Sequence, residues 1–276
     1  MPEMPEVITV VKDLKKLVVN KRIDKVFIRT PKLIKEVSIN EFTSFLINET
    51  IIDIRNLGKH IIFYLTNDKY LLSHLRMTGK YFVYKSFRKP TIHDHLYFQL
   101  SDGSFIFYND ARQFGTFHIK TKETLYTTKP LNSLGQTPDK IDANTLYNKL
   151  KKKTIPIKLT LLDQSIVLGL GNIYVNEALF AAKIHPETPT NKVTIEELKR
   201  ILIFSDQIMK KSVELGGSSI QSYSSVNGVR GGYQNHLKVH LRNNLPCFEC
   251  NTKIERMYIN KRSTYYCPKC QSQIKE

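Results

Sequence analysis

The chain has 276 residues, of which 41% are hydrophobic, enough for one large domain or two medium ones with a packed core. Lysine and arginine number 42 against 25 acidic residues, and the net charge of +17 predicts a polyanionic partner, nucleic acid ahead of a membrane surface. No run of 18 apolar residues occurs and no apolar signal segment follows the N-terminus, so we expect an intracellular protein without a membrane span.

The first six residues, Met1 to Glu6, contain a candidate nucleophile. Trimming of the initiator Met would leave Pro2 with a free secondary amine, and an α-amine has a pKa of ~7.7–8.0 against ~10.4 for lysine. Such an amine can attack a carbonyl carbon to give a Schiff base, with Glu3 beside it as a proton carrier. A frayed terminus is the ordinary alternative. Against it, apolar residues follow at helical spacing: Val7, Val10, Val11, Leu14, Leu17 and Val18.

Residues 23–120 read as short strands rich in β-branched and aromatic residues, separated by turns. This pattern predicts a sandwich or barrel rather than a parallel sheet. The expected strands are 23–30, 51–57, 60–65, 70–75, 95–100, 105–108 and 116–119.

The character of the chain changes after residue 120. Residues 121–140 read as a connector with proline and glycine breakers, and from about residue 143 the pattern is helical. The clearest helix begins at Thr194, where Glu197 three residues later predicts a capping box. Residues 216–235 are rich in glycine, serine and asparagine, so we expect a mobile loop there.

All four cysteines fall near the C-terminal end, as Cys247-x-x-Cys250 and Cys267-x-x-Cys270. Two such pairs predict one tetrahedral four-thiolate zinc site of the ribbon type, which is structural because four protein ligands leave no open position. Two disulfides are the alternative, but they are rare inside cells. A redox Cys-x-x-Cys is weaker still, because no βαβ pattern surrounds it.

Three polar stretches remain open to two interpretations. Residues 169–174 lack the third glycine of a dinucleotide loop, but glycines before Asn172 suit a helix N-terminus that binds phosphate as well as an ordinary capped turn. The basic residues 151–153 and Lys158 are either a solvated helix face or contacts to a phosphate backbone. His93 and His95 alternate on one strand, where hydrogen bonds or a phosphate contact are expected rather than a metal.

Two loops carry residues that suit either a protein core or a DNA base stack. Residues 74–79 leave one strand at a turn, and residues 109–115 join two others. Met77 and Phe114 are most simply core residues, yet at loop tips such side chains act as wedges between bases, and Arg112 could fill a vacated base position. Spacing alone does not choose between these.

Taken together, these segments resemble the formamidopyrimidine-DNA glycosylases, bacterial base-excision enzymes that remove oxidised purines. The matching motifs run the full length of the chain, in the family's order. They are Pro2-Glu3-Met4-Pro5-Glu6-Val7, Gly58-Lys59-His60, His74-Leu75-Arg76-Met77-Thr78-Gly79, Asp110-Ala111-Arg112-Gln113-Phe114-Gly115, Gly169-Leu170-Gly171-Asn172-Ile173-Tyr174, Ser218-Ser219-Ile220 with Gly232-Tyr233, and the two cysteine pairs with Arg262-Ser263-Thr264-Tyr265-Tyr266.

The resemblance implies a role for each residue that matches a family motif. Pro2, freed of Met1, would attack C1′ of the damaged nucleotide, with Glu3 as general acid and Lys59 as a proton donor near the lesion. The residues that would fill the gap left by the everted base are Met77, Arg112 and Phe114. The residues that would contact DNA and its phosphates are His93, Arg112, Lys153, Lys158, Asn172 and Arg262, the last also counted with the catalytic set.

The fold that the resemblance implies is an α+β multidomain chain with one structural zinc ion. It comprises an N-terminal β-sandwich with its N-terminal helix in residues 1–130, a helix–two-turn–helix domain in 131–238, and a zinc ribbon in 239–276. The loop 216–235 would close over the everted base. The implied activity is excision of 8-oxoguanine and formamidopyrimidines, followed by β,δ-elimination, by a cytoplasmic, nucleoid-associated monomer acting on double-stranded DNA.

The chain departs from the family pattern at six positions and leaves two rival functions open. The departures are Ala111, Gln113, Gln221, His240-Leu241 in place of Tyr-Gly, and Asn251 in place of glycine. None touches a catalytic position. The rivals are an endonuclease VIII-like enzyme for oxidised pyrimidines and a non-catalytic zinc-ribbon protein that binds DNA or RNA.

Overall fold

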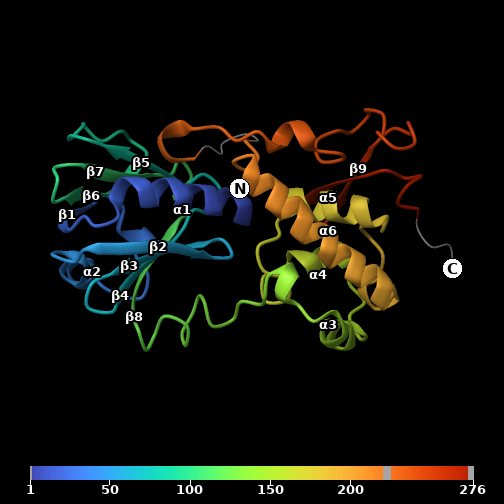
Figure 1. Ribbon diagram of the computed structural model, residues 1–276, viewed down its shortest axis with the longest axis horizontal. Helices are drawn as coiled ribbons and strands as arrows, with labels where there is room; N and C mark the ends of the chain where they lie inside the picture. The colour runs from blue at the N-terminus through green and yellow to red at the C-terminus, as the bar shows by residue number, and fades with distance from the viewer. Residues whose placement is uncertain (1, 220–224, 273–276) are drawn as a thin grey trace. The chain divides into compact units, whose positions relative to one another are not determined.

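The computed structural model describes residues 2–219 and 225–272. The chain divides into two compact units (Figure 1). The first comprises Met1–Asn132 together with Leu215–Gly232, and the second comprises Ser133–Glu214 together with Tyr233–Glu276. The segment from Leu215 to Gly232 therefore belongs with the strands of the first unit, although it follows the last long helix of the second.

The first unit contains two four-stranded antiparallel sheets, which confirms the expected β-sandwich. One sheet has the order β1-β6-β7-β5, and the other has the order β2-β3-β4-β8. The strands are β1 Ile23–Ile28, β2 Ile51–Leu57, β3 His60–Leu65, β4 Lys69–His74, β5 Lys80–Tyr84, β6 Asp94–Leu100, β7 Phe105–Asn109 and β8 Thr116–Thr121.

Helix α1, Met4–Val18, closes the first unit's core. Its apolar face (Val7, Val10, Val11, Leu14 and Val18) is buried, and the helix packs against β2 and β3. Pro5 occupies the first turn, where its missing N–H costs nothing. A second helix, α2 Ile39–Leu46, is capped by Ser38, whose hydroxyl accepts the Glu41 N–H. The sequence pattern predicts neither α2 nor β5.

The second unit consists of four helices and a β-hairpin within the described part of the chain. They are α3 Ala143–Leu150, α4 Ile157–Leu162, α5 Asn172–Ala182, α6 Ile195–Glu214, β9 Glu255–Ile259 and β10 Arg262–Tyr266. The predicted capping box before α6 is confirmed, because the Thr194 N–H donates to Glu197 at 2.8 Å and the Glu197 N–H donates to Thr194 at 3.2 Å. Short 3₁₀ turns lie at Pro31–Leu33, Pro138–Lys140, Thr190–Lys192, Val226–Gly228 and Tyr233–His236.

Helix α5 is the central element of the second unit, since nearly every residue along it is buried. Its Glu177 is buried too, and the carboxylate accepts the backbone N–H groups of Lys238, Val239 and His240 at 2.7–3.0 Å. A buried carboxylate needs such donors to offset the loss of water. Through them the helix holds the segment that leads into the cysteine module.

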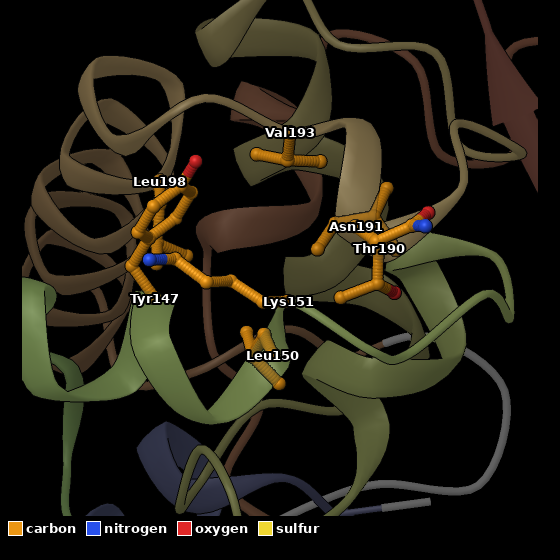
Figure 2. A pocket seen from close by; sticks show the side chains of 8 residues that line it. Tyr147, Leu150, Lys151, Thr190, Asn191, Val193 and Leu198 are labelled. Carbon is orange, nitrogen blue, oxygen red and sulfur yellow. The ribbon is translucent and has the colours of Figure 1, made fainter.

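No helix within residues 2–219 and 225–272 is both long and apolar enough to cross a membrane. Figure 2 shows a pocket in the second unit between α3, α6 and the Thr190–Lys192 turn. Its lining is mostly apolar, from Leu150, Val193 and Leu198, and its volume of about 10 Å³ barely admits one water molecule. It is a packing defect of the helical core and too small for a nucleobase.

Candidate active site and nucleic-acid interface

The N-terminus is folded into the first unit. Pro2 and Glu3 are buried, Glu3 with only 2% of its surface exposed. Glu3 and Glu6 form a capping box at the start of α1, in which the Glu3 N–H donates to Glu6 Oε2 at 2.8 Å. Met1 lies outside the described residues. Because α1 is anchored along its length, the backbone beside Pro2 has a fixed position.

Glu6 also holds the segment that follows α6. Its second oxygen, Oε1, accepts the Ser218 N–H at 2.8 Å, so one buried carboxylate joins residues 212 positions apart. Gly217 approaches it closely: a Cβ on Gly217, whose φ is +84°, would lie 3.1 Å from Glu6 Oε1. Nothing in the local spacing around Glu6 signals a contact this distant.

Lys59 lies in the two-residue turn between β2 and β3, after Gly58 with φ of +55°. Only 7% of its surface is exposed. His60 and His74 lie close by as a cross-strand pair with ring centroids 4.7 Å apart. Burial lowers the pKa of His60 to about 4 and, together with the nearby His60, Arg76 and Lys59, lowers that of His74. Both imidazoles are therefore neutral at pH 7.

The two loops that sequence left undecided carry their side chains differently. Met77 is partly buried, whereas Arg112 is exposed and 51% of Phe114 is exposed. The Arg112 guanidinium carbon lies 4.6 Å from the centre of the Phe114 ring, a cation–π distance. An exposed phenylalanine covered by an arginine is not a core residue, so the geometry favours the wedge interpretation for Phe114.

His93 lies just before β6, and its backbone carbonyl accepts the Asp110 N–H at 2.9 Å. Its neighbour His95 is buried, with Nδ1 paired to the Thr30 hydroxyl at 2.8 Å and Nε2 to the Asp110 carbonyl at 2.9 Å. Both ring nitrogens of His95 are engaged within the protein, and one of them holds the loop that carries Arg112. Of the two histidines, His93 is therefore the better candidate for a contact with DNA.

In the second unit, Asn172 and Arg262 come from neighbouring segments. Asn172 is the first residue of α5, and its Nδ2 donates to the Ser263 carbonyl at 2.9 Å. Its Oδ1 is buried and has no hydrogen-bond partner among the described residues. Arg262 is exposed at the start of β10, after a two-residue turn in which Asn260 and Lys261 both have positive φ. The first residue of α5 and the exposed arginine thus lie on two elements that contact each other.

Lys158 is fully buried, unlike the other residues we expected at phosphates. Its ammonium donates to Thr264 Oγ1 at 2.7 Å, Asn176 Oδ1 at 2.9 Å and the Ser263 carbonyl at 3.2 Å. An ammonium has three N–H groups, so these acceptors occupy them all. Its direct contact with DNA stays a prediction. Lys153, by contrast, is partly exposed, with its ammonium 3.9 Å from the Asp163 carboxylate.

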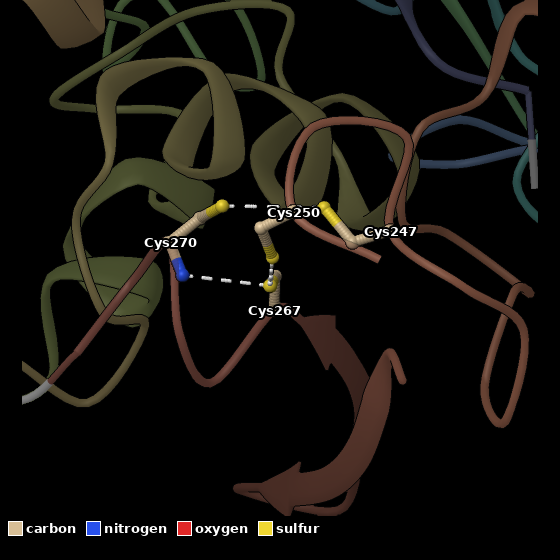
Figure 3. Close-up of side chains that lie close together, drawn as sticks. All are labelled: Cys247, Cys250, Cys267 and Cys270. Carbon is tan, nitrogen blue, oxygen red and sulfur yellow. Dashed lines mark hydrogen bonds between the residues drawn. The ribbon is translucent and has the colours of Figure 1, made fainter. Parts of the chain in front are cut away.

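The four cysteines gather at one point, as Figure 3 shows. Their sulfur atoms all lie within 4.8 Å of one another, with 4.0 Å between Cys247 and Cys270 and 3.4 Å between Cys250 and Cys267. Tetrahedral zinc with Zn–S bonds of about 2.3 Å separates its sulfurs by about 3.8 Å, so the geometry fits. No two of these sulfurs are bonded to each other, and the separations suit a shared metal ion rather than disulfides, whose S–S bonds are about 2.05 Å long. The predicted structural zinc site is confirmed.

Two departures from the family pattern fall at positions with positive φ. Asn251 has φ of +60° and donates its N–H to the Cys247 carbonyl at 3.0 Å, a conformation that asparagine tolerates. Leu241 also has φ of +60°, which is costly for leucine. Two further expectations, for Ile220 and Gln221, concern residues outside the described ranges.

A β-sandwich that fixes the N-terminus, a helical unit, and a four-thiolate ribbon together define a class of DNA glycosylases. Comparison of the sequence with known families gives the same class for each part of the chain. Residues 1–117 match the formamidopyrimidine-DNA glycosylase N-terminal domain, residues 134–224 match its H2TH domain, and residues 244–273 match the zinc finger found in FPG and IleRS. The chain belongs to the formamidopyrimidine-DNA glycosylase family.

Similar proteins match over nearly the whole chain. A formamidopyrimidine-DNA glycosylase of Mycoplasma mobile is 49% identical over 98% of this chain and 99% of its own length. One of Mycoplasmopsis pulmonis is 50% identical over 99% of both. Among solved structures, the Lactococcus lactis Fpg bound to abasic-site DNA has a TM-score of 0.93 at 34% identity, and a point mutant of that enzyme bound to Fapy-dG DNA has 0.93 at 35%. Each covers 99% of this chain and 100% of that one.

Proposed function

We propose that this chain removes oxidised purines from duplex DNA and then cuts the strand at the resulting abasic site. The observation that carries the proposal is the fixed N-terminus: Pro2 and Glu3 are buried, and Glu6 anchors the backbone beside them. A nucleophile must be held in place to act, and a frayed terminus could not be. The relatives named as formamidopyrimidine-DNA glycosylases and the Lactococcus complexes with damaged DNA support the same activity.

The chemistry begins with attack of the Pro2 nitrogen on C1′ of the damaged nucleotide. The bond from C1′ to the base breaks, and the base leaves with a proton that Glu3 supplies. Ring opening of the sugar gives an iminium between Pro2 and C1′. This cation acidifies the C2′ proton, and its removal expels the 3′ phosphate, so the strand breaks. A second elimination expels the 5′ phosphate and leaves a one-nucleotide gap. Water then hydrolyses the iminium, which frees the Pro2 amine and releases the unsaturated sugar remnant as an aldehyde.

The remaining residues bind and position the DNA. Lys59, buried in the turn beside His60, donates a proton or a hydrogen bond near the lesion. Met77, Arg112 and Phe114 fill the space vacated by the base, since extrusion of a base costs a few kcal/mol that inserted side chains offset. His93, Lys153, Asn172 and Arg262 contact the DNA, the last two at phosphates around the lesion. Lys158 remains a proposed contact to a DNA phosphate, and its ammonium also donates to the Ser263 carbonyl that Asn172 contacts.

The zinc ion, bound by the four cysteines, supplies folding energy to the ribbon and no step of the reaction. The net charge of +17 provides sequence-independent attraction to duplex DNA. We place the protein with the nucleoid in the cytoplasm, where such a substrate lies, and expect it to act as a monomer.

Borohydride trapping tests this proposal. Borohydride reduces an iminium to an amine, so a duplex with 8-oxoguanine should become covalently joined to the N-terminal peptide. A form that keeps one residue ahead of Pro2 is the matched control, because its proline nitrogen lies within a peptide bond and cannot attack. Equal strand cleavage by the blocked and free forms would contradict the proposal. Faster removal of thymine glycol than of 8-oxoguanine would move the protein to the pyrimidine-specific branch.

A further inference from the structure

The two loops that carry Met77, Arg112 and Phe114 meet at one buried carboxylate. Asp110, fully buried at the end of β7, organises its own loop first. Its Oδ1 accepts the Arg112 N–H at 3.1 Å, and its Oδ2 accepts the N–H groups of Phe114 and Gly115, both at 2.9 Å. These bonds set the backbone on both sides of the exposed Arg112 and Phe114 side chains.

Thr78 connects the second loop to the first. Its hydroxyl donates to Asp110 Oδ1 and accepts the Arg112 N–H at 3.1 Å. The residue next to Met77 is therefore bonded both to the carboxylate and to the backbone of Arg112. A hydroxyl that donates and accepts at once fixes the two loops relative to each other more firmly than either bond alone.

Tyr108 contacts both Asp110 and the ends of the two loops. Its buried hydroxyl lies 3.3 Å from Asp110 Oδ2, and burial together with the Asp110 charge raises its pKa, so it remains a donor at neutral pH. The ends of both loops press against it. A Cβ on Gly79 would lie 2.3 Å from this oxygen, and one on Gly115 would lie 1.8 Å away. Only glycine fits at either place.

We propose that Asp110 and Thr78 are positioning residues that join the two loops into one rigid insertion element. The inference rests on the proposed function, because it concerns how DNA is opened before the sugar is attacked. If the two loops were flexible, their inserted side chains would lose conformational entropy on entering the base stack. This entropic cost would make insertion into the opened duplex less favourable. The hydrogen bonds of Asp110 and Thr78 order the two loops before DNA binds, so less entropy is lost on insertion. This pair touches neither Pro2 nor Glu3, so the chemistry at C1′ does not depend on it.

The test is a comparison of two substrates with the Thr78→Val variant. Valine keeps the shape of threonine but removes the hydroxyl, and Thr78→Ser is the matched control that keeps it. Single-turnover rates are measured on a duplex with 8-oxoguanine paired to cytosine and on a single strand with an abasic site, which has no stack to open. We expect Thr78→Val to slow the first reaction about tenfold and the second less than about twofold, as for loss of one hydrogen bond to a charged group.

Equal slowing on both substrates, or slowing on neither, would overturn the inference, and so would a Thr78→Ser variant as slow as Thr78→Val. Asp110→Asn extends the test, because an amide turns a donor toward N–H groups that need an acceptor. Its expected loss on the paired lesion is larger, and its thermal transition reports whether it folds. Failure of the proposed function looks different: the unaltered protein would then give no borohydride adduct with either substrate.

Discussion

The cysteine module and the N-terminal site are built in opposite ways. The module's ligands come in two pairs, each within three residues, and its hairpin is closed by a two-residue turn. The N-terminal site depends on a carboxylate that reaches across the chain, from Glu6 to Ser218, and the loops that carry Met77, Arg112 and Phe114 depend on another, from Asp110 to Thr78. A site whose ligands lie close together in the sequence can be recognised from their spacing, and its loss should unfold only the segment that contains it. A site assembled from distant segments is invisible to spacing and should respond to changes far from the chemistry.

The largest effect is expected from removal of the zinc. Structural zinc contributes roughly 10–16 kcal/mol to the folding of small zinc modules, so Cys267→Ser or a strong chelator should unfold the ribbon and abolish tight DNA binding. The first unit should keep its own thermal transition, because all four sulfurs lie in the second. Metal analysis should find one zinc per chain in the unaltered protein. If the first unit lost its thermal transition together with the ribbon, the cysteine module would not be an independent local unit.

A smaller effect should follow from Glu6→Gln. The amide oxygen can accept only one of the two N–H groups, from Glu3 and Ser218, and the amide nitrogen then faces the other donor. We expect excision of 8-oxoguanine to slow about tenfold with the ribbon and its zinc intact. Glu41→Gln is the matched control, since Glu41 is an exposed carboxylate in the first turn of α2. Identical rates for both variants would show that the long-range contact does not matter.

The smallest effect concerns the backbone at Leu241, which has φ of +60°. Glycine takes this conformation without strain, whereas leucine pays a steric cost, only partly offset by glycine's greater freedom when unfolded. Leu241→Gly should therefore raise the free energy of unfolding by about 0.5–1 kcal/mol, measured by denaturant melts of the zinc-loaded protein. Leu245→Gly is the control: Leu245 is similarly exposed, but its φ is negative, and the change should destabilise. If Leu245→Gly also raised the free energy of unfolding, the positive φ at Leu241 would not be the cause of the effect.

Much of the fold could be predicted because its signals are short-range. The apolar spacing in α1, the capping box at Thr194 and Glu197, and most strands of the sandwich needed only periodicity and turn residues. Strand β5 escaped because it follows β4 after a turn of only a few residues and lacks a clear polar alternation. Helix α2 escaped because two turns are too short for a periodic signal.

By itself the sequence determined the zinc ligands, the candidate nucleophile and the class of partner, since these follow from spacing, from the position of Pro2 and from net charge. Tertiary structure alone decided which of these side chains are buried and hydrogen-bonded within the protein and which are exposed to solvent. It buried Lys158 among three acceptors, exposed Phe114 beneath Arg112, and brought Thr78 to Asp110. The reason is physical: a buried charge must find its hydrogen-bond partners wherever folding brings them, and those partners are distant in the chain.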